Sequence, residues 1–333
     1  MPRDEGTKKS VIVLGGTGFI GIKLLNQLVL DQGVNLHWIK RKKSCSPDIP
    51  GLPEPHIVED FENIDLSWLS QADVIIDLVS QGRARATQHR DINKRIRPHL
   101  RIIDGLLNNR SHIHYIYLSS GGAIYGNTAL TSLNEQSPCN PQTEYGLEKM
   151  IVETSLLSAA QNCLDVSILR ISNAYGQGQT IKPGFGVIPT MISALKNGSA
   201  FTVLGNGEMQ RDYVNVIDVQ RAITAAVRAK GAGIVNIATG HGTSINQLIA
   251  MVETLSGREL NKISVEADVS DPDFARLDIS RAKNVLQWQP TIRLEDGLSE
   301  ILQDAGLMSR INYSELPHTM NRDAFPPAGT GAA

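Results

Sequence analysis

The chain has 333 residues, of which 41% are hydrophobic and 20% are charged, and its formal net charge is −2. This composition is ordinary for a globular protein with one large α/β domain or a domain with a smaller companion. The near-neutral charge gives no reason to expect nucleic acid or a membrane as a partner, and the three cysteines lack metal-ligand spacing, so no metal is expected. A polar N-terminus and reduced thiols indicate a cytoplasmic protein.

The segment SVIVLGGTGFIGIKLLNQL predicts a buried strand, a glycine turn and a helix. Gly15 permits the tight turn, Gly18 lets the backbone approach a pyrophosphate, and Gly21 lets the helix pack close to the strand. Free N–H groups at the helix N-terminus favour phosphate. The predicted dinucleotide-binding turn consists of Gly15, Thr17, Gly18, Phe19, Ile20 and Gly21. The alternative is a glycine turn in an ordinary α/β unit.

Further strands are expected at 34–40, 56–60, 72–80, 112–120 and 164–172, with helices at 86–108 and 144–160. Strands that alternate with helices predict a doubly wound parallel α/β sheet covered on both faces. After Tyr175, loops rich in Gly and Pro alternate with short helices. We therefore expect a dinucleotide-binding domain at 1–175, a smaller substrate-binding lobe at 176–312 and a flexible tail at 313–333. The boundary is soft, since a strand at 235–238 can return to the main sheet.

A run of cations, Lys40 to Lys43, follows the second expected strand. Sites specific for NAD carry an acidic residue there for the adenosine ribose, and Lys40 takes its place. Lys40 and Arg41 can instead receive a 2′-phosphate, which favours NADP slightly over NAD. The alternative is a solvated charge run in a loop.

Tyr145 and Lys149 lie four residues apart and so share one face of a predicted helix. A tyrosine is a poor base at neutral pH, but a nearby ammonium favours its phenolate. Tyr145 can then take a proton from a substrate hydroxyl. An isolated pair of this kind is more often a solvated helix face, and the preceding glycine turn is what favours the catalytic interpretation.

Taken together, these motifs resemble the short-chain dehydrogenase/reductase superfamily. The glycine spacing GxxGxxG in GGTGFIG, with YGLEK, LRISNAYGQGQ, LGNGEMQRDYVNVIDV and LDISRAKNVLQWQP, resembles its extended branch of nucleotide-sugar epimerases and dehydratases. The resemblance covers about residues 10 to 305. It implies a Rossmann-type sheet with a smaller C-terminal substrate-binding lobe, and a homodimer formed through the 86–108 and 144–160 helices.

The resemblance also implies roles for single residues. Cofactor contacts are expected from Asp60 and Phe61 at the adenine, from Leu78, Val79 and Ser80 beneath the nicotinamide, and from Tyr145 and Lys149. Substrate contacts are expected from Ser120, Tyr145, Asn173, Arg211 and Arg276, the last replacing an arginine whose usual place is held by Asp268. Asp218 is expected to pin local structure, Glu135 to be structural, and Trp288 to pack the lobe.

Two departures from the family pattern narrow the choice of reaction. Relatives carry Ser or Thr four residues before the tyrosine of the "YG" pair, where this chain has Gly121. Either Ser120 supplies the hydroxyl from a flexible glycine loop, or Tyr145 acts alone. The Asp–Glu pair of the sugar 4,6-dehydratases is replaced by Gly122 and Ala123, so elimination lacks its acid and base.

The resemblance therefore implies a UDP-hexose 4-epimerase that forms a transient 4-keto sugar with bound NAD or NADP, in polysaccharide biosynthesis. The alternatives are an NADPH-dependent 4-keto-sugar nucleotide reductase and a non-enzymatic dinucleotide sensor.

Overall fold

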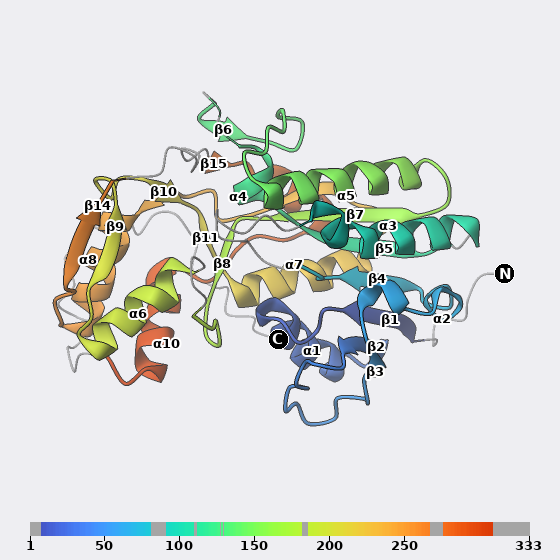
Figure 1. Ribbon diagram of the computed structural model, residues 1–333, viewed down its shortest axis with the longest axis horizontal. Helices are drawn as coiled ribbons and strands as arrows, with labels where there is room; N and C mark the ends of the chain where they lie inside the picture. Colours follow the sequence, from blue (N-terminus) through green and yellow to red (C-terminus); the bar gives the residue numbers. More distant parts are fainter. Residues whose placement is uncertain are drawn as a thin grey trace, which may run out of the picture.

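The computed structural model describes residues 8–80, 91–109, 112–126, 128, 130–181, 186–266 and 276–308. Its centre is a sheet of seven parallel strands in the order β12–β7–β5–β4–β1–β2–β3 (Figure 1). The strands are β1 (Lys9–Leu14), β2 (Val34–Arg41), β3 (His56–Val58), β4 (Val74–Asp77), β5 (His114–Ser120), β7 (Asp165–Ile171) and β12 (Gly233–Ile237). The expected doubly wound α/β fold is confirmed.

Helices cover both faces of this sheet (Figure 1). One face packs against α1 (Phe19–Leu30) and α7 (Val216–Arg228), and the other against α3 (Ile92–Asn108) and α5 (Glu144–Ala160). Because successive strand residues point to opposite faces, Val11 and Val13 enter the first core, whereas Ile12 and Leu14 enter the second. The apolar run of β1 is therefore buried on both sides.

Two expected elements differ from the structure by more than two residues. The helix expected at 86–108 begins at Ile92, after Asp91 caps it by accepting the N–H of Asn93 at 3.0 Å, and residues 86–90 lie outside the described part. The strand expected at 72–80 is confined to Val74–Asp77. Here the carboxylate of Asp77 accepts the N–H of Val79 at 2.9 Å and turns the chain out of the sheet.

The second lobe lies beyond one end of the sheet, at the left of Figure 1. Its elements are β8 (Asn173–Tyr175), α6 (Val187–Asn197), β9 (Phe201–Leu204), β10 (Gln210–Arg211), β11 (Tyr213–Asn215), β13 (Thr243–Ser244), α8 (Ile245–Ser256), β14 (Lys262–Val265) and α10 (Leu294–Asp304). It has a separate core that includes Met191, Leu248 and Leu298. Since β12 returns to the main sheet beside β7, the chain crosses between the two parts more than once.

Short elements complete the described chain: η1 (Phe61–Asn63), α2 (Leu66–Leu69), α4 (Gly121–Ile124), β6 (Ser132–Leu133), β15 (Arg276–Leu277) and α9 (Ser280–Leu286). The tail expected at 313–333 lies outside the described residues, as does Asp268. Within the described ranges, every helix is too short or too polar to cross a bilayer.

Candidate active site

The glycine turn between β1 and α1 has the geometry that a dinucleotide needs. Gly15 has φ +80°, and a Cβ there would lie 3.0 Å from the carbonyl carbon of Leu78, so the turn packs directly on the end of β4. A Cβ on Gly21 would lie 2.7 Å from the Gly15 carbonyl oxygen. Among the described residues, the only neighbour within 4 Å of a Cβ on Gly18 would be that same oxygen, at 3.5 Å, and none of their side chains caps α1. An anion can therefore approach the helix N-terminus.

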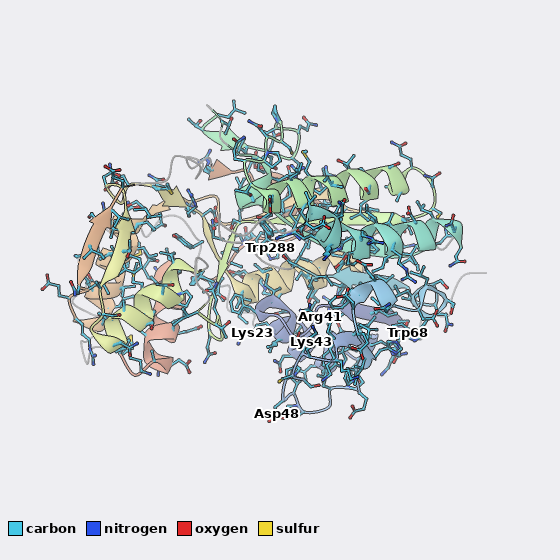
Figure 2. All side chains as sticks on the ribbon, viewed as in Figure 1. Lys23, Arg41, Lys43, Asp48, Trp68 and Trp288 are labelled. Carbon is cyan, nitrogen blue, oxygen red and sulfur yellow. The ribbon has the colours of Figure 1, made fainter. Side chains whose placement is uncertain are left out.

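The four residues predicted to hold the adenosine end lie at the ends of the paired strands β2 and β3: Lys40 and Arg41 end β2, and Asp60 and Phe61 follow β3. Leu14 pairs with Ile39, so Lys40 lies just beyond the last β1 pair, beside the glycine turn. Its ammonium donates to the Ser44 carbonyl at 3.0 Å. The Arg41 guanidinium lies 5.9 Å from the centre of the Phe61 ring, and Asp60 precedes that ring as the cap of η1. Arg41 and Lys43 are labelled at this end of the strand in Figure 2.

Tyr145 and Lys149 lie on the first turns of α5, which Thr143 caps by accepting the N–H of Gly146 at 3.1 Å. The Lys149 side chain is buried and donates to the Tyr117 hydroxyl at 3.0 Å and to the Leu118 carbonyl at 2.9 Å. The ammonium lies 5.7 Å from the centre of the half-buried Tyr145 ring. Because both acceptors are uncharged, they leave the positive charge of Lys149 available to Tyr145.

Two buried ion pairs flank this lysine, and sequence reasoning did not find them. Glu148 pairs with Arg95 of α3 at 2.5 Å, and Glu153 pairs with Arg170 of β7 at 2.6 Å. Each arginine neutralises the carboxylate that it contacts, so both acids can be buried beside Lys149. The only sequence signal was acidic residues on the apolar side of a predicted helix.

Asp77 forms a third buried cluster beneath the end of β4, and it too was missed. Its carboxylate lies 2.6 Å from His99 Nδ1, accepts the Tyr115 hydroxyl at 2.6 Å, and accepts the N–H of Val79. Burial raises the pKa of Asp77, but His99 and the hydrogen bonds lower it further, so the net direction is down. The cluster holds the turn that carries the predicted cofactor residues Leu78, Val79 and Ser80.

The serines at the end of β5 differ from the expectation of a flexible glycine loop. Gly121 and Gly122 begin the short helix α4, directly after Ser120. Ser119 and Ser120 are both buried, and the Ser119 hydroxyl has no hydrogen-bond partner among the described residues. By strand alternation Ser119 shares the face of Tyr117, and Ser120 points to the other face.

The two glycines of α4 face different surroundings. A Cβ on Gly121 would lie 2.6 Å from Leu277 Cδ1 and 3.2 Å from the Arg170 carbonyl oxygen, in packed surroundings. A Cβ on Gly122 would lie 3.7 Å from Asn173 Nδ2. A side chain at position 121 would therefore point into packing, whereas position 122 faces the predicted substrate residue.

The other three predicted substrate residues, Asn173, Arg211 and Arg276, lie on three separate strands. Asn173 lies on β8, where its Nδ2 donates to the Asp212 carbonyl at 3.2 Å. Arg211 lies on β10, half-buried, and donates to the Gln210 carbonyl at 2.8 Å. Arg276 is exposed on β15, which pairs with β6.

The three residues expected to have structural roles, Asp218, Trp288 and Glu135, each form hydrogen bonds with backbone groups of another segment. The buried Asp218 carboxylate accepts the N–H groups of Thr291 and Ile292 at 3.0 and 2.9 Å. The Trp288 indole donates to the Asp218 carbonyl at 2.9 Å, close to α7 (Figure 2). Glu135 accepts the N–H of Asn236 at 2.8 Å, beside β12.

Comparisons with known proteins agree with this architecture. The sequence model of the NAD-dependent epimerase/dehydratase family matches residues 11–238. The chain is 30% identical over 324 residues to the dTDP-4-dehydro-6-deoxyglucose reductase of Escherichia coli, covering 90% of this chain and 98% of that one.

Two solved structures are similar along nearly their whole length. The Thermotoga maritima UDP-glucose 4-epimerase with UDP-glucose is 27% identical, with a TM-score of 0.78 over 88% of this chain and 97% of that one. The Bacillus cereus UDP-glucuronic acid 4-epimerase, in complex with UDP-glucuronic acid and NAD, is 25% identical, with a TM-score of 0.77 over 89% and 99%.

Proposed function

The chain belongs to the NAD-dependent epimerase/dehydratase family, and we propose that it is a nucleotide-sugar 4-epimerase that acts on a UDP-hexose through a transient 4-keto sugar. The observation that carries the proposal is the Tyr145–Lys149 pair, with the ammonium buried beside the tyrosine ring and held by uncharged acceptors. The similarity to UDP-sugar 4-epimerases along nearly the whole chain supports the choice of reaction.

The glycine turn fits a dinucleotide for two reasons. Glycine occupies the positions where a side chain would obstruct the turn or the approach of the ligand, and the N-terminus of α1 has no side-chain cap among the described residues. Gly15, Gly18 and Gly21, with Thr17, Phe19 and Ile20, would hold the diphosphate. Lys40, Arg41, Asp60 and Phe61 would hold the adenosine end, and Leu78, Val79 and Ser80 the other half. When bound, the nicotinamide supplies a reversible hydride acceptor for C4 of the sugar.

Tyr145 exchanges the proton of the C4 hydroxyl. The buried charge of Lys149 favours the phenolate, which takes this proton as the ketone forms. After the keto sugar has rotated in the site, the Tyr145 hydroxyl returns the proton to the C4 oxygen, so no net oxidation occurs. Ser120, at the end of β5, stays our proposed donor of a hydrogen bond to the reacting oxygen, although strand alternation places it on the opposite face from Tyr117.

Asn173, Arg211 and Arg276 would hold the nucleotide sugar, since an arginine fork suits a diphosphate. Gly122 and Ala123 occupy the first turn of α4 and carry no acid or base. The elimination performed by sugar dehydratases therefore lacks its proton-transfer groups at this place.

The test is an NMR time course of the purified protein with UDP-glucose, UDP-galactose and their N-acetylated forms, with trace NAD or NADP and no reductant. Conversion of one sugar to its C4 epimer in large excess over cofactor is the expected result. No conversion across the panel would contradict the proposal.

A second candidate is an NADPH-dependent 4-keto-sugar nucleotide reductase. Two observations favour it: the position of Lys40 and Arg41 at the end of β2, and the 30% identity to the Escherichia coli reductase. The same cations lead us to propose NADP as the cofactor, slightly ahead of NAD. Stoichiometric oxidation of NADPH with a 4-keto sugar, without epimerisation, would identify the reductase.

We also propose a cytoplasmic homodimer assembled through α3 and α5. Leu147 and Leu157 of α5 are each 39% exposed, which supports an apolar contact along this helix. Sedimentation of Leu157→Asp beside the unaltered chain tests this proposal, and a dimer in both samples would contradict it.

A further inference from the structure

Asp212 directly follows the predicted substrate residue Arg211 and hydrogen-bonds to another one, Asn173. We call this point of the chain, between β10 and β11, the joint. Asp212 is the single residue between these two strands, and it is buried. β10 pairs with β13, and β11 pairs with β8. The chain therefore changes from one small sheet to another at this residue, and the backbone ladders on either side do not by themselves fix the angle between them.

The carboxylate of Asp212 ties this joint to the edge of the main sheet. One oxygen accepts the Ser172 hydroxyl at 3.0 Å and the N–H of Thr239 at 2.9 Å, and the other accepts the N–H of Gly240 at 2.7 Å. These donors follow β7 and β12, which are adjacent and parallel, with Ile171 opposite Ile237. The carboxylate thus binds the carboxyl ends of two strands.

The backbone of Asp212 holds Asn173. Its carbonyl accepts the main-chain N–H of Asn173 at 2.9 Å and the side-chain Nδ2 at 3.2 Å. These two bonds set the plane of the Asn173 amide, which faces Gly122 of α4. Arg211 precedes Asp212 directly, so its Cα position depends on the same joint.

We propose that Asp212 is the positioning residue that orients Asn173 and Arg211 toward the nucleotide diphosphate of the substrate. The ligand class rests on the proposed function, whereas the positioning of Asn173 rests on the contacts alone. An amide in place of the carboxylate supplies one acceptor oxygen and turns an N–H toward a backbone N–H, so Asp212→Asn breaks the joint without changing its size.

The experiment compares Asp212→Asn with Asp218→Asn as a matched control. Asp218 is fully buried and likewise accepts two backbone N–H groups, at Thr291 and Ile292, but it does not contact Asn173. Calorimetry with UDP gives nucleotide binding, and fluorescence titration with NADPH gives cofactor binding. We expect Asp212→Asn to weaken UDP binding about tenfold or more and NADPH binding less than about twofold. The control should leave UDP binding within about twofold of the wild type.

Equal losses of UDP binding in both variants would reduce Asp212 to a structural residue and overturn the proposal. If Asp212→Asn does not fold, Ser172→Ala removes one donor, and an unchanged UDP affinity there would overturn it as well. If the wild type binds no UDP, the proposed substrate is wrong, but the crystal structure of Asp212→Asn remains decisive. An Asn173 amide in its original position would contradict the positioning role.

Discussion

The Lys149 ammonium lies 5.7 Å from the centre of the Tyr145 ring, with the two residues on successive turns of α5. The lysine is only 2% exposed, so its charge acts through protein rather than through water. Its hydrogen-bond acceptors, the Tyr117 hydroxyl and the Leu118 carbonyl, are uncharged and do not cancel that charge. This geometry is the reason that we propose the two residues as the proton-transfer pair.

Tyr145→Phe should lower the rate of epimerisation by about 10²- to 10⁴-fold, because the proton then has no acceptor at the C4 oxygen. The measurement is the NMR time course with the substrate found active. Tyr125→Phe is the matched control, since it likewise removes one tyrosine hydroxyl, in this case a buried one that donates to Asn236 Oδ1 at 2.7 Å. Comparable rate losses in both variants would argue against a proton-transfer role for Tyr145.

Arg95→Met should lower the free energy of unfolding by about 3–5 kcal/mol, because Glu148 is left buried without its partner. The double variant Arg95→Met with Glu148→Leu should recover most of this loss, since it removes both charges. Urea denaturation of the wild type, both single variants and the double variant checks the difference. A double variant as unstable as the sum of its single changes would contradict the pairing.

Gly121→Ala and Gly122→Ala should have different effects on stability although both lie in α4. Alanine favours a helix at either place, but at position 121 its Cβ would meet Leu277 Cδ1 and the Arg170 carbonyl oxygen. We expect Gly121→Ala to be less stable than Gly122→Ala by about 1–3 kcal/mol, the usual cost of overpacking. Equal unfolding midpoints in denaturant would show that the packing around Gly121 yields freely.

Lys40→Met should weaken NADPH binding about tenfold or more and leave NADH binding nearly unchanged, because only NADPH carries the 2′-phosphate. The control is Lys42→Met, which removes the same charge from a lysine that pairs with Glu59 at 2.9 Å on the surface. Fluorescence titrations of both cofactors check this. Equal effects on NADPH and NADH would rule out recognition of the 2′-phosphate by Lys40.

His114 should make the protein less stable in mild acid. Burial lowers the pKa of this imidazole to about 4, with Lys9 acting in the same direction and Asp165 against it. A folded-state pKa below the ordinary value near ~6.5 means that the unfolded chain takes up the proton first. The stabilisation is complete above about pH 6.5 and falls by roughly 3 kcal/mol as the pH drops to about 4.

The local contacts of His114 agree with a neutral ring. Ser167 Oγ accepts the N–H of Ala232 at 3.0 Å and lies 2.8 Å from His114 Nε2, to which it can donate only if that nitrogen is unprotonated. Denaturant unfolding at several pH values should therefore show a shallower acid limb for His114→Gln than for the wild type. His56→Gln, which makes the same change at an exposed position on β3, is the control.

Much of the fold was predictable because its signals are local. Each signal depends on residues within one short segment: the apolar runs of β1, β4, β5 and β7, the glycine turn, and the helical spacing of α5. Parallel strands then place their carboxyl ends at one edge, which brings the glycine turn and Lys40 together. The Tyr145–Lys149 relation follows from helix geometry alone.

The supporting groups were not predictable, because their partners are distant in the chain. Arg95 and Glu148 are separated by 53 positions, and Asp212 and Gly240 by 28. An acid in an apolar segment has no visible partner in the sequence, so its burial cannot be inferred from spacing. What a Cβ on Gly121 of α4 would meet likewise depends on Leu277, which lies on the distant strand β15.

The sequence by itself determined the order of strands and helices along the chain, the glycine turn after β1 and the residues that we propose for the chemistry, since those depend on period and local backbone freedom. Only the tertiary structure decided which buried charges neutralise one another, where the serines and glycines after β5 point, and how Asp212 joins two strand ends to Asn173. These outcomes depend on contacts between segments that meet only after the chain has folded, and burial is what makes each of those contacts energetically important.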